Sequence, residues 1–193
     1  GCNFSAMKRL ILLLIACNSL FTGLAAGQAE KASNSSPKWL WIDENAKSET
    51  IFGRRAFTIA SLPKTAKLSI TCDNGFIAFV NGTKVGNGDE WAKRYEFDVK
   101  KHLQVGDNVL AVKATNEGSK AGLVAKLIMT HKNSKVDIVV TDNQWWVSRK
   151  KLEGWQAPSI NTEDWQRPVL LGKMGIAPWG NVFAKAGSRN KES

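Results

Sequence analysis

The chain is poor in the residues that most often build catalytic and metal centres. It contains three cysteines, two histidines and one tyrosine among 193 residues. Cys2 and Cys17 fall within the first 29 residues, so Cys72 is the one cysteine of the main domain. A single cysteine cannot close an internal disulfide, and we expect Cys72 to pack as a small buried hydrophobe. His102 and His131 show no zinc-ligand spacing.

Motifs that carry catalytic chemistry are also missing. The sequence has no phosphate-binding loop, no dinucleotide fingerprint and no Gly-x-Ser-x-Gly turn. A glycosidase needs two carboxylates held a few ångström apart, whereas the acidic pairs Asp89–Glu90 and Glu163–Asp164 lie in loop-like stretches where carboxylates are usually solvated. The chain also has no room for a catalytic barrel beside its main domain. We therefore expect a non-catalytic protein.

The N-terminus has the order of a secretory signal. Lys8 and Arg9 follow Met7, an apolar run covers 10–16, and small residues fill 23–29. The apolar run is shorter than the roughly 20 residues of a membrane-spanning helix, and no later segment supplies one. These features predict an exported protein, periplasmic or extracellular, without a transmembrane span.

The exact processing of this signal is left open by the sequence. Residues 1–6 precede the start methionine, and cleavage after Ala26 or Ala29 would fit the small-residue pattern. Residues 14–17 read Leu-Ile-Ala-Cys, which is similar to the lipobox of bacterial lipoproteins, so lipid anchoring at Cys17 is the lesser alternative. We divide the chain into an upstream and signal region (1–29), a flexible leader (30–37), one folded domain (38–183) and a flexible tail (184–193).

The chain carries a formal net charge of +10. A basic surface attracts acidic glycans, nucleic acid or anionic lipid without specificity. However, lysines and arginines are scattered, with part of the excess at the two ends and no long basic block. This distribution favours a solvated surface, and we expect no nucleic-acid partner.

Alternation of apolar and polar residues predicts strands. Residues 66–72 alternate without a miss, and residues 122–129 repeat the pattern. In 136–140 we expect Val136, Ile138 and Val140 to face the core. Residues 76–80 and 108–114 are apolar on both faces, as in central strands, and turn residues such as Asn81–Gly82 separate the runs. Short antiparallel strands at this spacing predict an all-β sandwich.

An ordered set of short segments carries a family resemblance. These segments, in chain order, are Phe-Gly-Arg-Arg-Ala-Phe at 52–57, a strand ending in Asp73–Asn74, an aromatic strand ending in Asn81–Gly82, and Gly-Asp-Asn-Val-Leu-Ala-Val at 106–112. The set resembles the galactose-binding-domain-like jelly roll, as in the N-terminal modules of bacterial α-L-rhamnosidases and the sugar-binding domains of β-galactosidase and β-glucuronidase relatives. The resemblance covers about 39–179 and implies a jelly-roll β-sandwich that acts as a non-catalytic module.

Eight tryptophans are many for one small domain. Flat aromatic faces hold sugar rings, but they also fill cores, and we expect five or six of the eight to be structural. Trp91, in a Gly- and Asp-rich loop, and one of the adjacent pair Trp145 and Trp146 are the expected ligand platforms. If 143–147 is a strand, one of that pair points inward and the other outward.

Polar residues complete the candidate ligand-binding site. Asn116, where a strand opens into a loop, is the best expected partner for sugar hydroxyls, and Asp73 is a further candidate. For Asp73 and Asn74 the structural alternative is a local turn-capping role. Arg55 either pairs with a carboxylate or presents its guanidinium to a ligand, and the sequence does not separate these two.

The sequence therefore predicts an exported, non-catalytic carbohydrate-binding module, which could be an accessory piece of a glycan-processing protein. The alternative is a structural or protein-interaction β-sandwich that packs against neighbouring domains and binds no sugar. An exposed apolar patch around 145–165 would favour that alternative. We expect no cofactor, although a structural calcium ion held by Asp, Asn and backbone oxygens is compatible with this fold.

Overall fold

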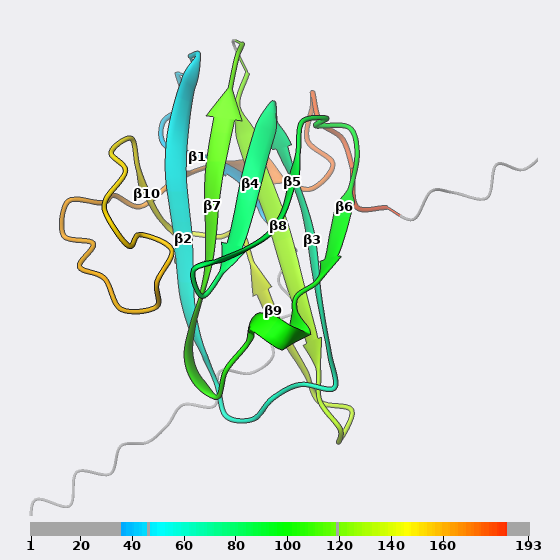
Figure 1. Ribbon diagram of the computed structural model, residues 1–193. Helices are drawn as coiled ribbons and strands as arrows, with labels where there is room; N and C mark the ends of the chain where they lie inside the picture. Colours follow the sequence, from blue (N-terminus) through cyan, green and yellow to red (C-terminus); the bar gives the residue numbers. More distant parts are fainter. Residues whose placement is uncertain (1–35, 46, 119, 185–193) are drawn as a thin grey trace, which may run out of the picture. The chain divides into compact units, whose positions relative to one another are not determined.

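A computed structural model describes residues 36–45, 47–118 and 120–184 of the chain (Figure 1). The expected signal region, most of the expected leader and nearly all of the expected tail lie outside these residues, so those assignments stay predictions. The described part is almost entirely strand and turn, with one short 3-10 helix, η1 (Lys100–His102).

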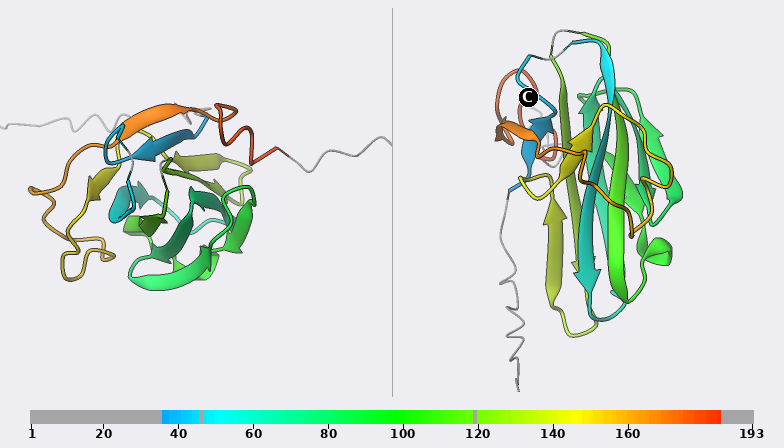
Figure 2. Two further views of the ribbon diagram at one scale, coloured as in Figure 1. Left: turned by 90° about the horizontal axis from the view of Figure 1, so that it is seen from above. Right: turned by 90° about the vertical axis from the view of Figure 1, so that its left-hand side faces the viewer.

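Eleven antiparallel strands of the described chain form two sheets that pack face to face (Figure 2). The first sheet has the order β11 (Val169–Lys173), β1 (Lys38–Trp41), β8 (Gly122–Thr130), β3 (Thr65–Asp73) and β6 (Tyr95–Asp98), and β9 (Val136–Val140) also pairs with β8. The second sheet has the order β10 (Trp146–Ser148), β2 (Glu49–Ile59), β7 (Gly106–Asn116), β4 (Gly75–Val80) and β5 (Thr83–Gly88). The predicted all-β sandwich is confirmed.

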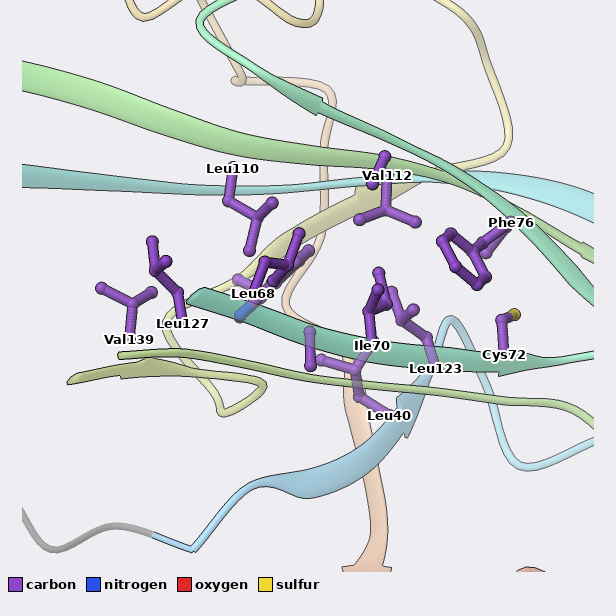
Figure 3. Close-up of a cluster of buried hydrophobic side chains, with 14 of the residues drawn as sticks. Leu40, Leu68, Ile70, Cys72, Phe76, Leu110, Val112, Leu123, Leu127 and Val139 are labelled. Atoms are coloured by element: carbon purple, nitrogen blue, oxygen red, sulfur yellow. The ribbon is translucent and has the colours of Figure 1, made fainter. Parts of the chain in front are cut away.

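The core lies between the two sheets (Figure 3). Every second residue of β3 is buried there, as the alternation predicted: Ala66, Leu68, Ile70 and Cys72. β8, the neighbour of β3 in the same sheet, contributes its own alternating set of core residues. Leu110 and Val112 of β7 face these two strands from the second sheet. Removing this apolar surface from water is the main stabilising contribution to the fold.

The expected facing of β9 is wrong. Val139 packs in the core, whereas Val136 and Ile138 are only half-buried and Val140 is buried outside the main core cluster. The register explains this, because Val139 lies directly opposite Leu127, which faces the core, and directly opposite residues of an antiparallel pair share a face. A one-residue error in phase places the other set of side chains on the core face.

Cys72 is buried in the core, as predicted. Burial of the thiol, together with the adjacent charge of Asp73, raises the pKa of Cys72 far above its ordinary value. A thiol that stays protonated is a poor nucleophile, so Cys72 contributes packing in this fold.

The Asn81–Gly82 turn ties the second sheet to the loop that carries η1. Asn81 and Gly82 both have positive φ, 49° and 83°, as a tight two-residue hairpin requires. The side-chain amide of Asn81 donates to His102 O (2.9 Å) and to Oδ1 of the buried Asn108 (2.8 Å), and its oxygen accepts from Val109 N (2.8 Å). These bonds fix the η1 loop against β7.

We expect Gly86→Ala to destabilise the domain. A Cβ at Gly86 would lie 2.2 Å from the ring of Phe97, and this ring packs edge-on against Phe76. Overpacking of this kind costs about 1–3 kcal/mol, measurable as a lower urea midpoint of unfolding. Gly118→Ala is the matched control because no atom lies within 4 Å of its Cβ position; equal losses in both variants would contradict the packing described.

Candidate functional site

One end of the sandwich gathers several of the residues predicted for ligand binding. The pairings Asp73–Gly122 and Glu49–Asn116 both lie at this end, so the β3–β4 corner and the β7–β8 loop lie there together. The loop between β5 and β6 joins them, because Gly88 O and Asp89 Cα lie within 4 Å of the Cβ position of Gly75. We call residues 73–74, 89–94 and 116–118 the Trp91 end.

Trp91 is the most exposed tryptophan of the domain, at 36%. Its loop is held on β3, since the Thr71 hydroxyl donates to the carbonyl oxygens of Trp91 (3.1 Å) and Glu90 (3.3 Å). Thr71 is fully buried. The loop that carries the exposed indole is thus anchored to Thr71, which lies two residues before Asp73 in β3.

The carboxylate of Asp73 is oriented by a residue far away in the sequence. Asp73 is buried, and its Oδ2 accepts a hydrogen bond of 2.8 Å from Trp179 Nε1. Trp179 in turn stacks on Trp39, with ring centroids 4.5 Å apart. Gly122 makes room for both rings, because a Cβ there would lie 2.8 Å from Trp39 and 3.0 Å from Trp179.

The amides of Asn74 and Asn116 organise the adjoining loops. Asn74 Oδ1 accepts from Glu117 N at 2.6 Å. Asn116 is buried, and its amide nitrogen donates to Lys47 O and Gly118 O, both at 2.8 Å. The contact of Asn74 matches the structural role that the sequence analysis gave it. The loop contacts of Asn116 were not expected, and a ligand contact by Asn116 stays a prediction.

Arg55, Trp145 and Trp146 lie elsewhere, where β10 pairs with β2. The guanidinium of Arg55 pairs with Asp142, with Nε 3.8 Å from Oδ1, and also donates to Gln144 Oε1. The carboxylate partner that the sequence allowed for Arg55 is therefore present. This group is separate from the Trp91 end.

The adjacent tryptophans pack into different hydrophobic clusters, although the strand on which the prediction of opposite orientations depended begins only at Trp146 and does not cover 143–147. Trp145 is fully buried and donates its indole N–H to Val140 O at 2.8 Å. Trp146 is half-buried, and the guanidinium of Arg167 lies 3.7 Å above the centre of its ring. Arg167 thus covers one face of the Trp146 ring. A sugar that stacked on this face would have to displace the guanidinium, and the role of Trp146 as a ligand platform stays a prediction.

Two contacts that position the Trp91 end were missed by the sequence analysis. One is the bond from Trp179 to Asp73. The other joins Arg94 of the Trp91 loop to the C-terminal segment, where Arg94 Nη1 donates to Phe183 O at 3.0 Å. The sequence shows only that Trp179 lies between a proline and a glycine in an aromatic-rich segment. This pattern does not indicate which residue Trp179 contacts.

The described residues contain neither a cluster of metal ligands nor a membrane-spanning helix. No group of three His, Cys, Asp or Glu side chains there could hold a metal ion. Calcium also accepts amide and backbone oxygens, so this result does not test the structural calcium ion that the sequence allowed without predicting it. No helix in the described ranges is long and apolar enough to cross a membrane.

The chain is similar to proteins that act on or bind sugars. No family model matches it. An α-L-rhamnosidase from Streptomyces avermitilis is 27% identical over 175 residues, which cover 84% of this chain and 17% of the enzyme. The crystal structure of the S. avermitilis α-L-rhamnosidase complexed with L-rhamnose superposes with a TM-score of 0.72 at 26% identity, over 76% of this chain and 15% of that one.

A lectin shares the same architecture. The lectin from Pleurotus ostreatus in complex with GalNAc superposes with a TM-score of 0.68 at 27% identity, over 76% of this chain and 44% of the lectin. The fold is that of a galactose-binding-like module. The resemblance predicted from the sequence is therefore confirmed, while the chain spans less than a fifth of the S. avermitilis α-L-rhamnosidase.

We expect Trp179→Phe to destabilise this module through Asp73. The variant keeps an aromatic ring but removes the N–H that binds the buried carboxylate, and an unsatisfied buried group costs about 1–3 kcal/mol. Trp39→Phe is the matched control, because within the described residues Trp39 Nε1 has no hydrogen-bond partner. Urea unfolding of both variants measures the difference, and equal losses would show that the Trp179–Asp73 bond contributes nothing.

Proposed function

We propose that the domain is an exported, non-catalytic carbohydrate-binding module whose ligand lies at the Trp91 end. The observation that carries this proposal is the exposed indole of Trp91, held by Thr71 beside the corner that contains Asp73 and Asn74. The C–H groups of a sugar ring pack on such an aromatic face, and nearby carboxylate and amide groups accept or donate hydrogen bonds to its hydroxyls.

The similar proteins support this reading. One of the matching structures is a lectin in complex with GalNAc, and another is an α-L-rhamnosidase complexed with L-rhamnose. Because the similarity covers only 17% of the rhamnosidase, it supports an accessory role better than the enzyme's own reaction. L-rhamnose and GalNAc are therefore the first sugars to test.

The alternative, a structural or protein-interaction module, lacks the observation that would favour it. An exposed apolar patch around 145–165 would have favoured that reading. Trp145, Trp155 and Trp165 are buried, and Arg167 stacks on Trp146. The large hydrophobic residues that are exposed in the described chain are elsewhere: Leu62, Trp91, Val105 and Ile176.

We expect Trp91→Ala to weaken sugar binding by about tenfold, which corresponds to about 1.4 kcal/mol of lost stacking. Few-contact sugar sites bind in the high micromolar to millimolar range, so isothermal titration calorimetry at high sugar concentration is the measurement. Titrations with L-rhamnose, GalNAc and a panel of other sugars, each with and without calcium, also test whether binding depends on a calcium ion.

Two controls locate the site. Trp91→Phe keeps an aromatic face and should retain most of the affinity. Trp146→Ala removes the other predicted platform and should leave binding unchanged. A loss of binding in Trp146→Ala with none in Trp91→Ala would move the site to β10, and a folded protein silent across the whole panel would count against sugar binding.

A further inference from the structure

The end of the sandwich opposite the Trp91 end is formed by three loops, at the lower end of the view in Figure 1. β2 finishes there at Ile59, paired with Gly106, and β8 finishes there at Thr130, paired with Thr65. Lys64 N donates to Thr130 O at 2.7 Å, so two of these loops lie side by side. We call residues 60–64, 98–107 and 131–137 the lysine end.

Positive charge exceeds negative charge at the lysine end. It contains five lysines and three aspartates. Asp137 is shared by Lys135, at 3.0 Å, and His131, at 2.9 Å. Four exposed lysines make no ion pair within the described residues: Lys64, Lys100, Lys101 and Lys132.

Exposed aliphatic side chains lie among these lysines. Leu62 is 53% exposed and Val105 is 60% exposed, the two highest values among the exposed large hydrophobic residues of the described chain. Both belong to the lysine end. Aliphatic side chains flanked by lysines are typical of protein surfaces that bind the interface of a charged membrane.

A hollow opens between two of the loops. It has a volume of about 600 Å³ and is lined by Leu62, Leu103, Lys100, Lys101 and Asp98. The side chain of Asp98 is engaged at the start of η1, where Oδ1 accepts from Lys100 N at 3.0 Å. The lining offers aliphatic surface and ammonium groups but no aromatic ring, so it suits an anionic headgroup with an acyl chain better than a sugar ring.

The other end of the domain has the opposite balance of charge. The loops at 43–49, 73–74, 89–94 and 116–120 contain seven acidic and four basic residues, and Arg149 adds a fifth cation by pairing with Asp43 and Glu49. A negatively charged surface would therefore attract the lysine end and repel the Trp91 end.

We propose that the lysine end docks on an anionic phospholipid surface, with Lys100 and Lys101 contacting headgroups and Leu62 entering the interface. The Trp91 end would then face away from the membrane. This inference does not depend on sugar binding, because it rests on residues at the other end of the domain.

The test is sedimentation of the full chain with vesicles of phosphatidylcholine alone or with 30% phosphatidylglycerol. Each lysine near an anionic surface contributes roughly fivefold in binding, so Lys100→Glu with Lys101→Glu should weaken binding to anionic vesicles by about 25-fold or more. Lys47→Glu with Lys120→Glu is the matched control for charge at the opposite end. All variants share the same N-terminal segment, so its contribution cancels in the comparison.

The apolar contact is tested separately. Leu62→Ser should weaken binding to anionic vesicles several-fold, whereas Ile176→Ser, which alters an exposed residue outside the lysine end, should not. Equal binding by the two double-charge variants would overturn the proposal. So would binding to the acidic polysaccharide alginate that depends on Lys100 and Lys101 without any such dependence on vesicles, which would assign the surface to an acidic glycan.

Discussion

The long pairing of β2 with β7 is the constraint on which the rest of this domain depends. Eleven residues of each strand are in register, from Glu49 opposite Asn116 to Ile59 opposite Gly106. This ladder makes the two ends distinct: the Asn116 loop lies at one end, and the loops with the free lysines lie at the other. A slip of one residue would turn the core-facing side chains of one of these strands to the opposite face of the sheet, so the positions of both surfaces depend on this register.

The Trp91 end is assembled from segments that the ladder alone does not bring together. Trp179 lies 106 residues after Asp73 in the chain and donates a hydrogen bond to its carboxylate. The carbonyl oxygen of Phe183 accepts a hydrogen bond from the guanidinium of Arg94. The C-terminal segment thus contacts both the buried carboxylate and the loop that carries the exposed indole. The proposed sugar site would therefore depend on Trp179 and Phe183 as well as on the residues that contact the ligand, because these two hold Asp73 and the Trp91 loop in place.

Local patterns predicted the strands well and the contacts between distant residues poorly. Perfect alternation in 66–72 fixed the buried face of β3, but in β9 three valines and an isoleucine leave the pattern ambiguous, and the partner Leu127 decides the face. Likewise, a strand through Trp145 and Trp146 would point the two rings apart, yet no local signal showed that Arg167 would cover Trp146. Side-chain partners set by tertiary packing have no periodicity from which to predict them.

Separation of the two ends also bears on what kind of module this is. A sugar-binding protein that acts alone needs only one functional end. A domain with an aromatic, acidic end and an aliphatic, basic end would instead take a defined orientation on a charged surface. The rigid sandwich between them holds the ends apart, so a contact made at one leaves the other accessible. Charge and fold therefore act together: the register separates the surfaces, and their opposite charges determine which of them an anionic partner meets.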